Sequence, residues 1–142
     1  MQESCKNNVE LRTYDHNKIL RFESIVRCSD HPSYRCNLVV DSNGFSARRE
    51  FYFDEWNLKD FVTKLTKMAK NLEGSATLKQ EYEPDYVTLE VEQQRGHVTV
   101  TGELWQQSVP AQHLTFAFIT DQTSLAPLVE DFQHLLKLGK VR

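Results

Sequence analysis

The sequence predicts an α+β fold in which a mostly antiparallel sheet is built from two ββββα halves, with both helices packed on one face. Three observations lead to this fold class. Two stretches carry apolar residues at helical spacing, four alternating runs precede each of them, and the second stretch repeats the first at an offset of about 67 residues. The strands supply the only large apolar surface on which the helical stripes can be buried. With 142 residues we expect a single domain over residues 1–142, with pseudo-repeat halves at about residues 9–74 and 75–139.

The first half opens with four runs that alternate between apolar and polar residues. They are "VELRTY", "KILRFESIVR", "RCNLVV" and "GFSARREFYF". The sequence "DSNG" between the last two is the clearest turn signal in the chain. We therefore expect four strands before the first helix.

The first helix is predicted from apolar residues that share one face. These are Leu58, Phe61, Val62, Leu65, Met68, Ala69 and Leu72. Asp54 lies just before this stripe, and Gly74 is expected to form the C-terminal cap. Trp56, at the start of the helix, is expected to pack against the preceding strand as a staple rather than to contact a ligand.

The second half contains four further runs, "ATLKQEY", "YVTLEVEQ", "HVTVTGELW" and "HLTFAFIT". The inward positions of the last three are Val87, Leu89, Val91, Val98, Val100, Leu104, Leu114, Phe116 and Phe118. We interpret Arg95-Gly96 as a two-residue hairpin turn. That turn pairs Glu92 with Thr99, Glu90 with Thr101 and Thr88 with Glu103.

The second helix carries a stripe that matches the first position by position. Its members are Leu125, Leu128, Val129, Phe132, Leu135 and Leu136. Asp121 corresponds to Asp54, Gly139 is expected to end the helix, and Pro127 is tolerated because it lies in the first turn. A true internal duplication and a chance similarity of amphipathic strands both remain open.

Composition restricts the class of partner and the cellular compartment. The formal net charge of −3 argues against nucleic acid, because proteins that neutralise phosphates carry a strongly basic face. No run approaches the roughly 18 apolar residues of a membrane span, and "MQESCKNNVE" lacks the apolar core of a signal peptide, so we expect no membrane association. Three cysteines without a CxxC pair suit a reducing compartment. We expect a cytoplasmic protein.

The candidate binding site is the outward face of the second-half strands. Its residues are Tyr86, Glu90, Glu92, His97, Thr99, Thr101, Glu103, Trp105 and His113. The carboxylates and imidazoles could bind a metal or transfer protons, but alternating polar residues also typify any solvated antiparallel sheet. Their spacing matches no metal motif. Trp105 either anchors an interface or folds under the loop "QQSVPAQ".

Catalytic signatures are absent from the sequence. It contains no GxSxG, HExxH, P-loop or helix-opening GxGxxG motif. We therefore predict a non-enzymatic protein without a catalytic residue, metal ligand or cofactor.

The stretches "FYFDEWNLKDFVTKL", "RGHVTV" and "FITDQTSLAPLVEDF" together resemble a family of short uncharacterised bacterial proteins. Some members of that family are similar to the immunity proteins of contact-dependent toxin systems of the wall-associated type. The resemblance covers the chain from about Arg35 onward. It implies a cytoplasmic bacterial binding protein and supplies no active-site residues.

These observations favour a protein-binding module that inhibits a toxin domain as an immunity-type protein. Two alternatives stay open. One is a small-molecule or metal-binding enzyme that uses the polar sheet face, with Glu90, Glu92, His97 and His113 as its functional groups. The other is a homodimeric structural protein that associates through the outer face or an edge strand.

Overall fold

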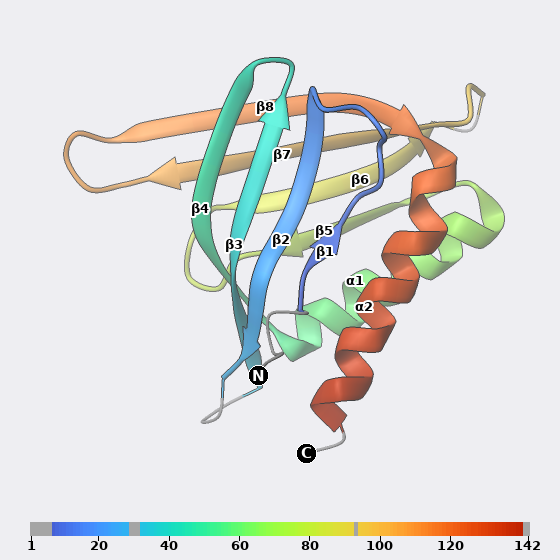
Figure 1. Ribbon diagram of the computed structural model, residues 1–142, viewed down its shortest axis with the longest axis horizontal. Helices are drawn as coiled ribbons and strands as arrows, with labels where there is room; N and C mark the ends of the chain where they lie inside the picture. Colours follow the sequence, from blue (N-terminus) through green and yellow to red (C-terminus); the bar gives the residue numbers. More distant parts are fainter. Residues whose placement is uncertain (1–6, 29–31, 93, 141–142) are drawn as a thin grey trace.

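A computed structural model describes residues 7–28, 32–92 and 94–140 of the chain. It contains two four-stranded antiparallel sheets, each followed by a helix, which confirms the predicted α+β class and its ββββα halves (Figure 1). The strands of the first half are β1 (Val9–Glu10), β2 (Lys18–Arg27), β3 (Ser33–Ser42) and β4 (Phe45–Asp54). The helix α1 (Glu55–Asn71) follows them. The second half contains β5 (Ser75–Lys79), β6 (Tyr86–Glu92), β7 (His97–Gln106), β8 (Gln112–Asp121), the 3₁₀ turn η2 (Gln122–Ser124) and α2 (Leu125–Lys140).

The strands divide into two sheets, β1-β2-β3-β4 and β5-β6-β7-β8, rather than forming one continuous sheet. In Figure 1 the first sheet crosses the strands of the second, and both helices lie together beside them. The free edge of β4 is occupied by the β5–β6 loop. Glu81 N donates to Tyr52 O at 3.0 Å, and Tyr52 N donates to the Gln80 side-chain oxygen at 2.7 Å. Because these contacts use the β4 edge, β5 pairs only with β6.

Two hairpin turns were predicted, and one of them is confirmed. Asn43 and Gly44 have φ of 54° and 94°, which is the pattern of a two-residue turn with both central residues at positive φ. The Arg95-Gly96 turn is wrong as a two-residue connection, because Glu92 pairs with His97. Gly96 N and Arg95 N both donate to Glu92 O, at 3.0 and 3.2 Å, and this closes a longer loop.

The corrected register of that hairpin moves every predicted cross-strand pair by two residues. Glu90 faces Thr99, and Thr88 faces Thr101. A slip of two residues leaves each side chain on its original face, since strand side chains alternate with a period of two. The predicted inward and outward faces are therefore correct, although the predicted residue pairs are not.

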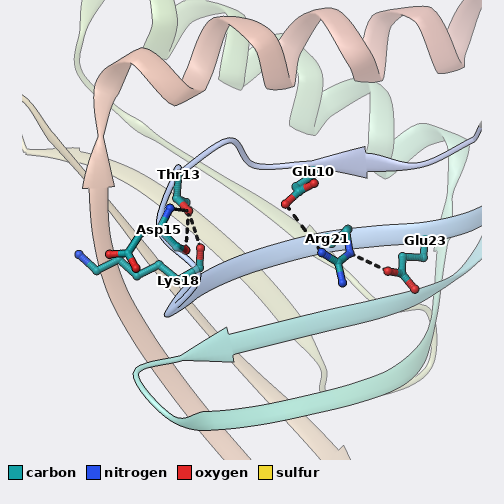
Figure 2. Close-up of polar contacts among 6 residues, drawn as sticks. All are labelled: Glu10, Thr13, Asp15, Lys18, Arg21 and Glu23. Carbon is teal, nitrogen blue, oxygen red and sulfur yellow. Dashed lines mark hydrogen bonds and ion pairs between the residues drawn. The ribbon is translucent and has the colours of Figure 1, made fainter.

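The first strand is shorter than the predicted run "VELRTY". After Leu11 N donates to Leu20 O, the chain leaves the sheet through a turn built around Thr13. The Thr13 hydroxyl donates to Lys18 O at 2.6 Å and accepts from Asp15 N at 3.2 Å, as Figure 2 shows. Local side-chain bonds of this kind compete with the strand ladder.

The apolar stripes of both helices are buried, as expected. Asp54 caps α1 by accepting from Asn57 N at 2.6 Å, and Asp121 plays the equivalent part at η2 by accepting from Thr123 N at 2.8 Å. The C-cap of α1 is Leu72, with φ of 56°, rather than Gly74. The helix α2 continues through Gly139 to Lys140, so the prediction that Gly139 ends it is wrong.

Trp56 corrects another expectation from the sequence. Its side chain is 81% exposed, so it does not pack against the preceding strand as a staple. The first-turn position of Trp56 lies out of phase with the stripe that Leu58 and Phe61 begin, and both of these are fully buried. Trp56 therefore points toward solvent because of its position around the helix, although its indole is apolar.

The two halves share one hydrophobic cluster. The ring of Phe132 on α2 lies edge-on to Phe22 of β2 and to Phe61 of α1, with centroid distances of 5.4 and 5.7 Å. The helix of the second half therefore packs against a strand and a helix of the first half. Neither helix in the described ranges is long and apolar enough to cross a membrane.

Every edge strand of the two sheets meets another element. The β5–β6 loop covers β4, and α1 covers β5 through the Asn57 side chain, which accepts from Lys79 N at 2.8 Å. The helix α2 packs against β1. On β8, Ile119 O accepts from Lys18 Nζ at 2.9 Å and Ala117 O accepts from Ser42 Oγ at 3.0 Å.

Candidate functional site

The nine residues of the predicted binding face occur on β6, β7 and β8. All nine are half-buried or exposed on the outward side of the second sheet, and those on β6 and on β7 up to Glu103 alternate with buried residues. The register sets them in rows across the strands. Tyr86, Glu103, Trp105 and His113 lie toward one end of the sheet and Glu92 and His97 at the other, and the remaining three lie between them: Glu90, Thr99 and Thr101.

Four of the residues form a connected group, here named the Trp105 cluster: Tyr86, Glu103, Trp105 and His113. Glu103 is at its centre, accepting from Tyr86 OH at 2.9 Å and lying 3.1 Å from His113 Nε2. The bond to Glu103 raises the pKa of the Tyr86 hydroxyl. The Trp105 and His113 rings are stacked, with centroids 3.5 Å apart and an interplanar angle of 11°. The cluster presents a rigid aromatic and acidic surface.

The remaining predicted residues do not join this cluster. Glu92 faces His97, and His97 in turn lies opposite Asp121. Trp105, the partner of His113, is about 27 Å along β7 from His97 at roughly 3.4 Å for each strand residue. The two histidines therefore cannot share one metal ion. Within the described part of the chain, no group of three or more His, Cys, Asp or Glu side chains could hold a metal.

The sequence left open whether Trp105 anchors an interface or folds under the loop that follows it, and its environment combines features of both. The side chain is half-buried, and its Nε1 is buried without a hydrogen-bond partner. The loop residues 107–111 are exposed, and the indole stacks on His113 of β8. Trp105 is thus held in place while the surface beside it stays accessible.

Sequence reasoning missed two polar residues that bind the Trp105 backbone, the buried Asp85 and the half-buried Arg49. Asp85 is 1% exposed and accepts from Trp105 N at 3.3 Å, while Arg49 donates to Trp105 O at 2.9 Å. Burial raises the pKa of Asp85, against the opposing effects of the Trp105 N–H and the Arg49 charge. The alternation along β4 could have predicted the position of Arg49, because Arg49 and Phe51 are two residues apart and point to the same inward side.

A cleft of about 520 Å³ lies beside this polar pair, between β4 and the β5–β6 loop. It is lined by Cys28, Ser33, Arg49, Glu50, Tyr52, Gln80, Glu81, Tyr82 and Glu83. Tyr82 is 97% exposed at the loop tip, and Tyr52 is 37% exposed on β4. A smaller cleft of about 340 Å³ includes Trp105 and His113, and Arg49 lines both. The Trp105 cluster and the β4 cleft are therefore neighbouring parts of one surface, of which the sequence predicted only the first.

A comparison with protein-family models matches residues 6–138 to the family described as "Immunity protein WapI-like family". The match begins well before Arg35, where the resemblance noted from the sequence began, so it includes β1 and β2. Neither the search of curated proteins nor the search of solved structures found a match. Because the family match spans nearly the whole chain and all the described elements of both sheets, the chain belongs to the WapI-like immunity protein family.

Proposed function

We propose that the protein is the immunity partner of a bacterial protein toxin, acts in the cytoplasm, and inhibits the toxin by binding rather than by catalysis. The family match over residues 6–138 carries this proposal. An immunity protein must recognise a toxin domain, so the second question is which surface it uses.

The Trp105 cluster is the part of the predicted face best suited to anchor a partner. Its aromatic rings are fixed by stacking and its carboxylate by two hydrogen-bonding neighbours. Side chains that are ordered before binding lose little conformational entropy on association. Trp and Tyr are also enriched among the residues that contribute most to protein interfaces. Tyr86, Glu103, Trp105 and His113 are accordingly our proposed contact residues, with Glu90, Glu92, His97, Thr99 and Thr101 extending the same face.

The test uses the toxin encoded by the neighbouring gene. Its toxic domain is produced with the immunity protein, the complex is separated, and affinity is measured by calorimetry. Trp105→Ala is expected to weaken binding by about 1–2 kcal/mol, as for an interface anchor. Trp105→Phe keeps an aromatic ring, and Glu130→Ala removes an exposed carboxylate of α2 outside the predicted face, so both serve as controls. Wild-type protein that neither binds the toxin nor protects cells from it would refute the proposal.

Stoichiometry distinguishes inhibition by binding from an enzymatic effect. Toxin activity is titrated with increasing immunity protein and followed over time. A tight inhibitor gives an end point at a fixed molar ratio that does not change with incubation. If a small fraction of immunity protein progressively inactivated excess toxin, the non-enzymatic part of the proposal would be wrong.

A further inference from the structure

The cleft between β4 and the β5–β6 loop carries an excess of negative charge. Glu50, Glu81 and Glu83 line it, and within the described ranges none of the three is in an ion pair. Glu50 accepts from Tyr52 OH at 3.0 Å, and Glu83 accepts from the Gln107 amide at 2.9 Å. These neutral donors orient Glu50 and Glu83 without adding a positive charge.

Other carboxylates of the protein have cationic partners. Glu23 is paired with Arg21 and Arg48, and Glu55 is paired with Arg27. The cleft carboxylates differ from these in being grouped and unpaired.

The cations closest to the cleft do not neutralise it. Arg49 lines the cleft, but its guanidinium is bound to Trp105 O and to the Gln106 side chain at 2.9 and 3.3 Å. Arg35 lies opposite Tyr52 in the β3–β4 register, is exposed, and interacts with the Tyr52 hydroxyl, which also binds Glu50. Three carboxylates therefore face two arginines, Arg49, which is bound to the β7 segment, and Arg35, which lies beside the Tyr52 hydroxyl, so the negative charge is in excess.

Exposed aromatic rings accompany these carboxylates. Tyr82 is almost fully exposed at the tip of the β5–β6 loop, and Tyr52 presents its ring beside the Glu50 carboxylate. Aromatic faces attract guanidinium and ammonium groups, and carboxylates bind guanidinium in a bidentate manner. The chemistry of the cleft is complementary to an arginine or lysine side chain.

Backbone contacts hold the cleft in shape. Besides the two bonds between the loop and Tyr52, Gln80 N donates to Asp85 O at 3.0 Å, and the Asp85 carboxylate accepts from Trp105 N. The loop is thus joined at one end to β4 and at the other to β7. These bonds hold both walls of the cleft, and Arg49 lines both this cleft and the adjacent smaller one that includes Trp105.

We infer that the β4 cleft is a docking groove for a cationic segment of the partner protein, with an arginine side chain bound by Tyr52, Tyr82 and the three carboxylates. This inference rests on the proposed function for the identity of the partner, and on charge complementarity for its chemistry. The partner contributes an exposed segment rich in arginine. Binding weakens with ionic strength, because exposed charges are screened by salt.

The first experiment tests the groove without a toxin. A hexa-arginine peptide is titrated into the full-length protein, and backbone amide shifts are followed by NMR. The largest shifts are expected at β4 and the β5–β6 loop. The triple variant Glu50→Gln, Glu81→Gln and Glu83→Gln should weaken binding about tenfold, equivalent to about 1.4 kcal/mol.

A matched triple variant removes the same number of carboxylates outside both the cleft and the predicted binding face: Asp60→Asn, Glu73→Gln and Glu130→Gln. All three positions are exposed, so this control should reduce peptide affinity less than about twofold if the groove is specific. Tyr82→Ala should weaken binding without changing the melting temperature, since its side chain is outside the core. Equal losses in the two triple variants, or shifts spread over the whole surface, would overturn the inference.

The second experiment measures the toxin domain against the same variants. If wild-type protein binds the toxin and the cleft variant binds it with unchanged affinity, the groove is not the docking site. The inference about the groove is then refuted, while the proposed function is not. If wild-type protein does not bind the toxin, the proposed function fails, and the peptide titration still decides whether the groove recognises arginine. A cleft variant that loses at least about tenfold in toxin affinity, with the control unchanged, would support both.

Discussion

Replacing Gly102 by alanine tests the packing beneath the proposed binding face. Gly102 is in the middle of β7, paired with Val87 on one side and Phe116 on the other, and it points inward. A Cβ atom at this position would lie 2.5 Å from Tyr86 O and 2.5 Å from the Cζ of Phe116. Both distances are far inside van der Waals contact. Because one of the two atoms belongs to the backbone of β6, a rotation of the Phe116 ring alone cannot relieve the clash.

The expected cost follows from overpacking. Extra methylenes in a well-packed core destabilise proteins by about 1–3 kcal/mol. For 142 residues, an unfolding entropy of about 2.1 cal/mol/K per residue gives roughly 0.3 kcal/mol/K. Gly102→Ala should therefore lower Tm by about 3–10 °C.

Urea denaturation followed by circular dichroism measures the free energy of unfolding, and calorimetry gives Tm. The matched control is Thr101→Ala on the outward side of the same strand, where the change should stay below about 1 kcal/mol, the span of strand propensity. Combining Gly102→Ala with Phe116→Leu should recover part of the loss, with a coupling energy of at least about 0.5 kcal/mol. A Gly102→Ala protein within about 0.5 kcal/mol of wild type would show that β6 and β7 adjust easily and would refute the reasoning.

Three further perturbations test the faces and the charged groups. Val100→Asp should unfold the protein, because an unpaired buried carboxylate costs several kcal/mol against a total of about 5–15, whereas Thr101→Asp on the outward side should leave a cooperative transition in urea. Burial raises the pKa of Asp85, so the folded state binds this proton more tightly than the unfolded state, and the stability of wild type relative to Asp85→Asn should fall as the pH rises from about 4 through the raised pKa. Bonds from Arg27 and a neighbouring lysine lower the pKa of Glu55, so Glu55→Gln should cost about 0.5–1 kcal/mol at pH 7. That contribution should be lost as the pH falls below the usual value of 4.5 through the lowered pKa.

The outcomes that would contradict these predictions are equally specific. A folded Val100→Asp protein would mean that water can reach the inward side of β7 at this position. A stability difference between wild type and Asp85→Asn that does not change with pH would show that the carboxyl has an ordinary pKa. A Glu55→Gln penalty of the same size at pH 3 and pH 7 would point to packing rather than to charge.

The alternation of residues along the strands predicted the faces of the second sheet, and the hydrophobic stripes predicted both helices. A shift of two residues in the pairing leaves every side chain on the same face of the sheet. The predicted face was therefore right, while the predicted Arg95-Gly96 turn was not. Trp56 was misplaced because its position at the helix start is typical of a staple, whereas its helical phase directs it away from the buried stripe. Gly139 was assigned to a helix end because glycine is common there, but a helix can also continue through it.

Contacts between distant segments could not be predicted from local patterns. Asp85 is buried by the backbone of Trp105 and the side chain of Arg49, which are separated from it by about 20 to 36 residues along the chain. The division of the strands into two sheets depends on the loop that binds the edge of β4. Each of these is a long-range hydrogen-bonding arrangement, and it leaves no periodic signal in the sequence.

The covered sheet edges have a consequence for how the protein behaves when it is abundant. Exposed strand edges offer unpaired N–H and C=O groups on which other chains can add strands, and this is a common route to aggregation. Here the β4 edge is used by the β5–β6 loop, α1 binds Lys79 N of β5, α2 packs on β1, and side chains from the first sheet bind carbonyls of β8. A partner that added a strand at these positions would have to displace these contacts. We expect recognition through side chains rather than strand addition, and a concentrated solution that resists fibril growth in a thioflavin assay.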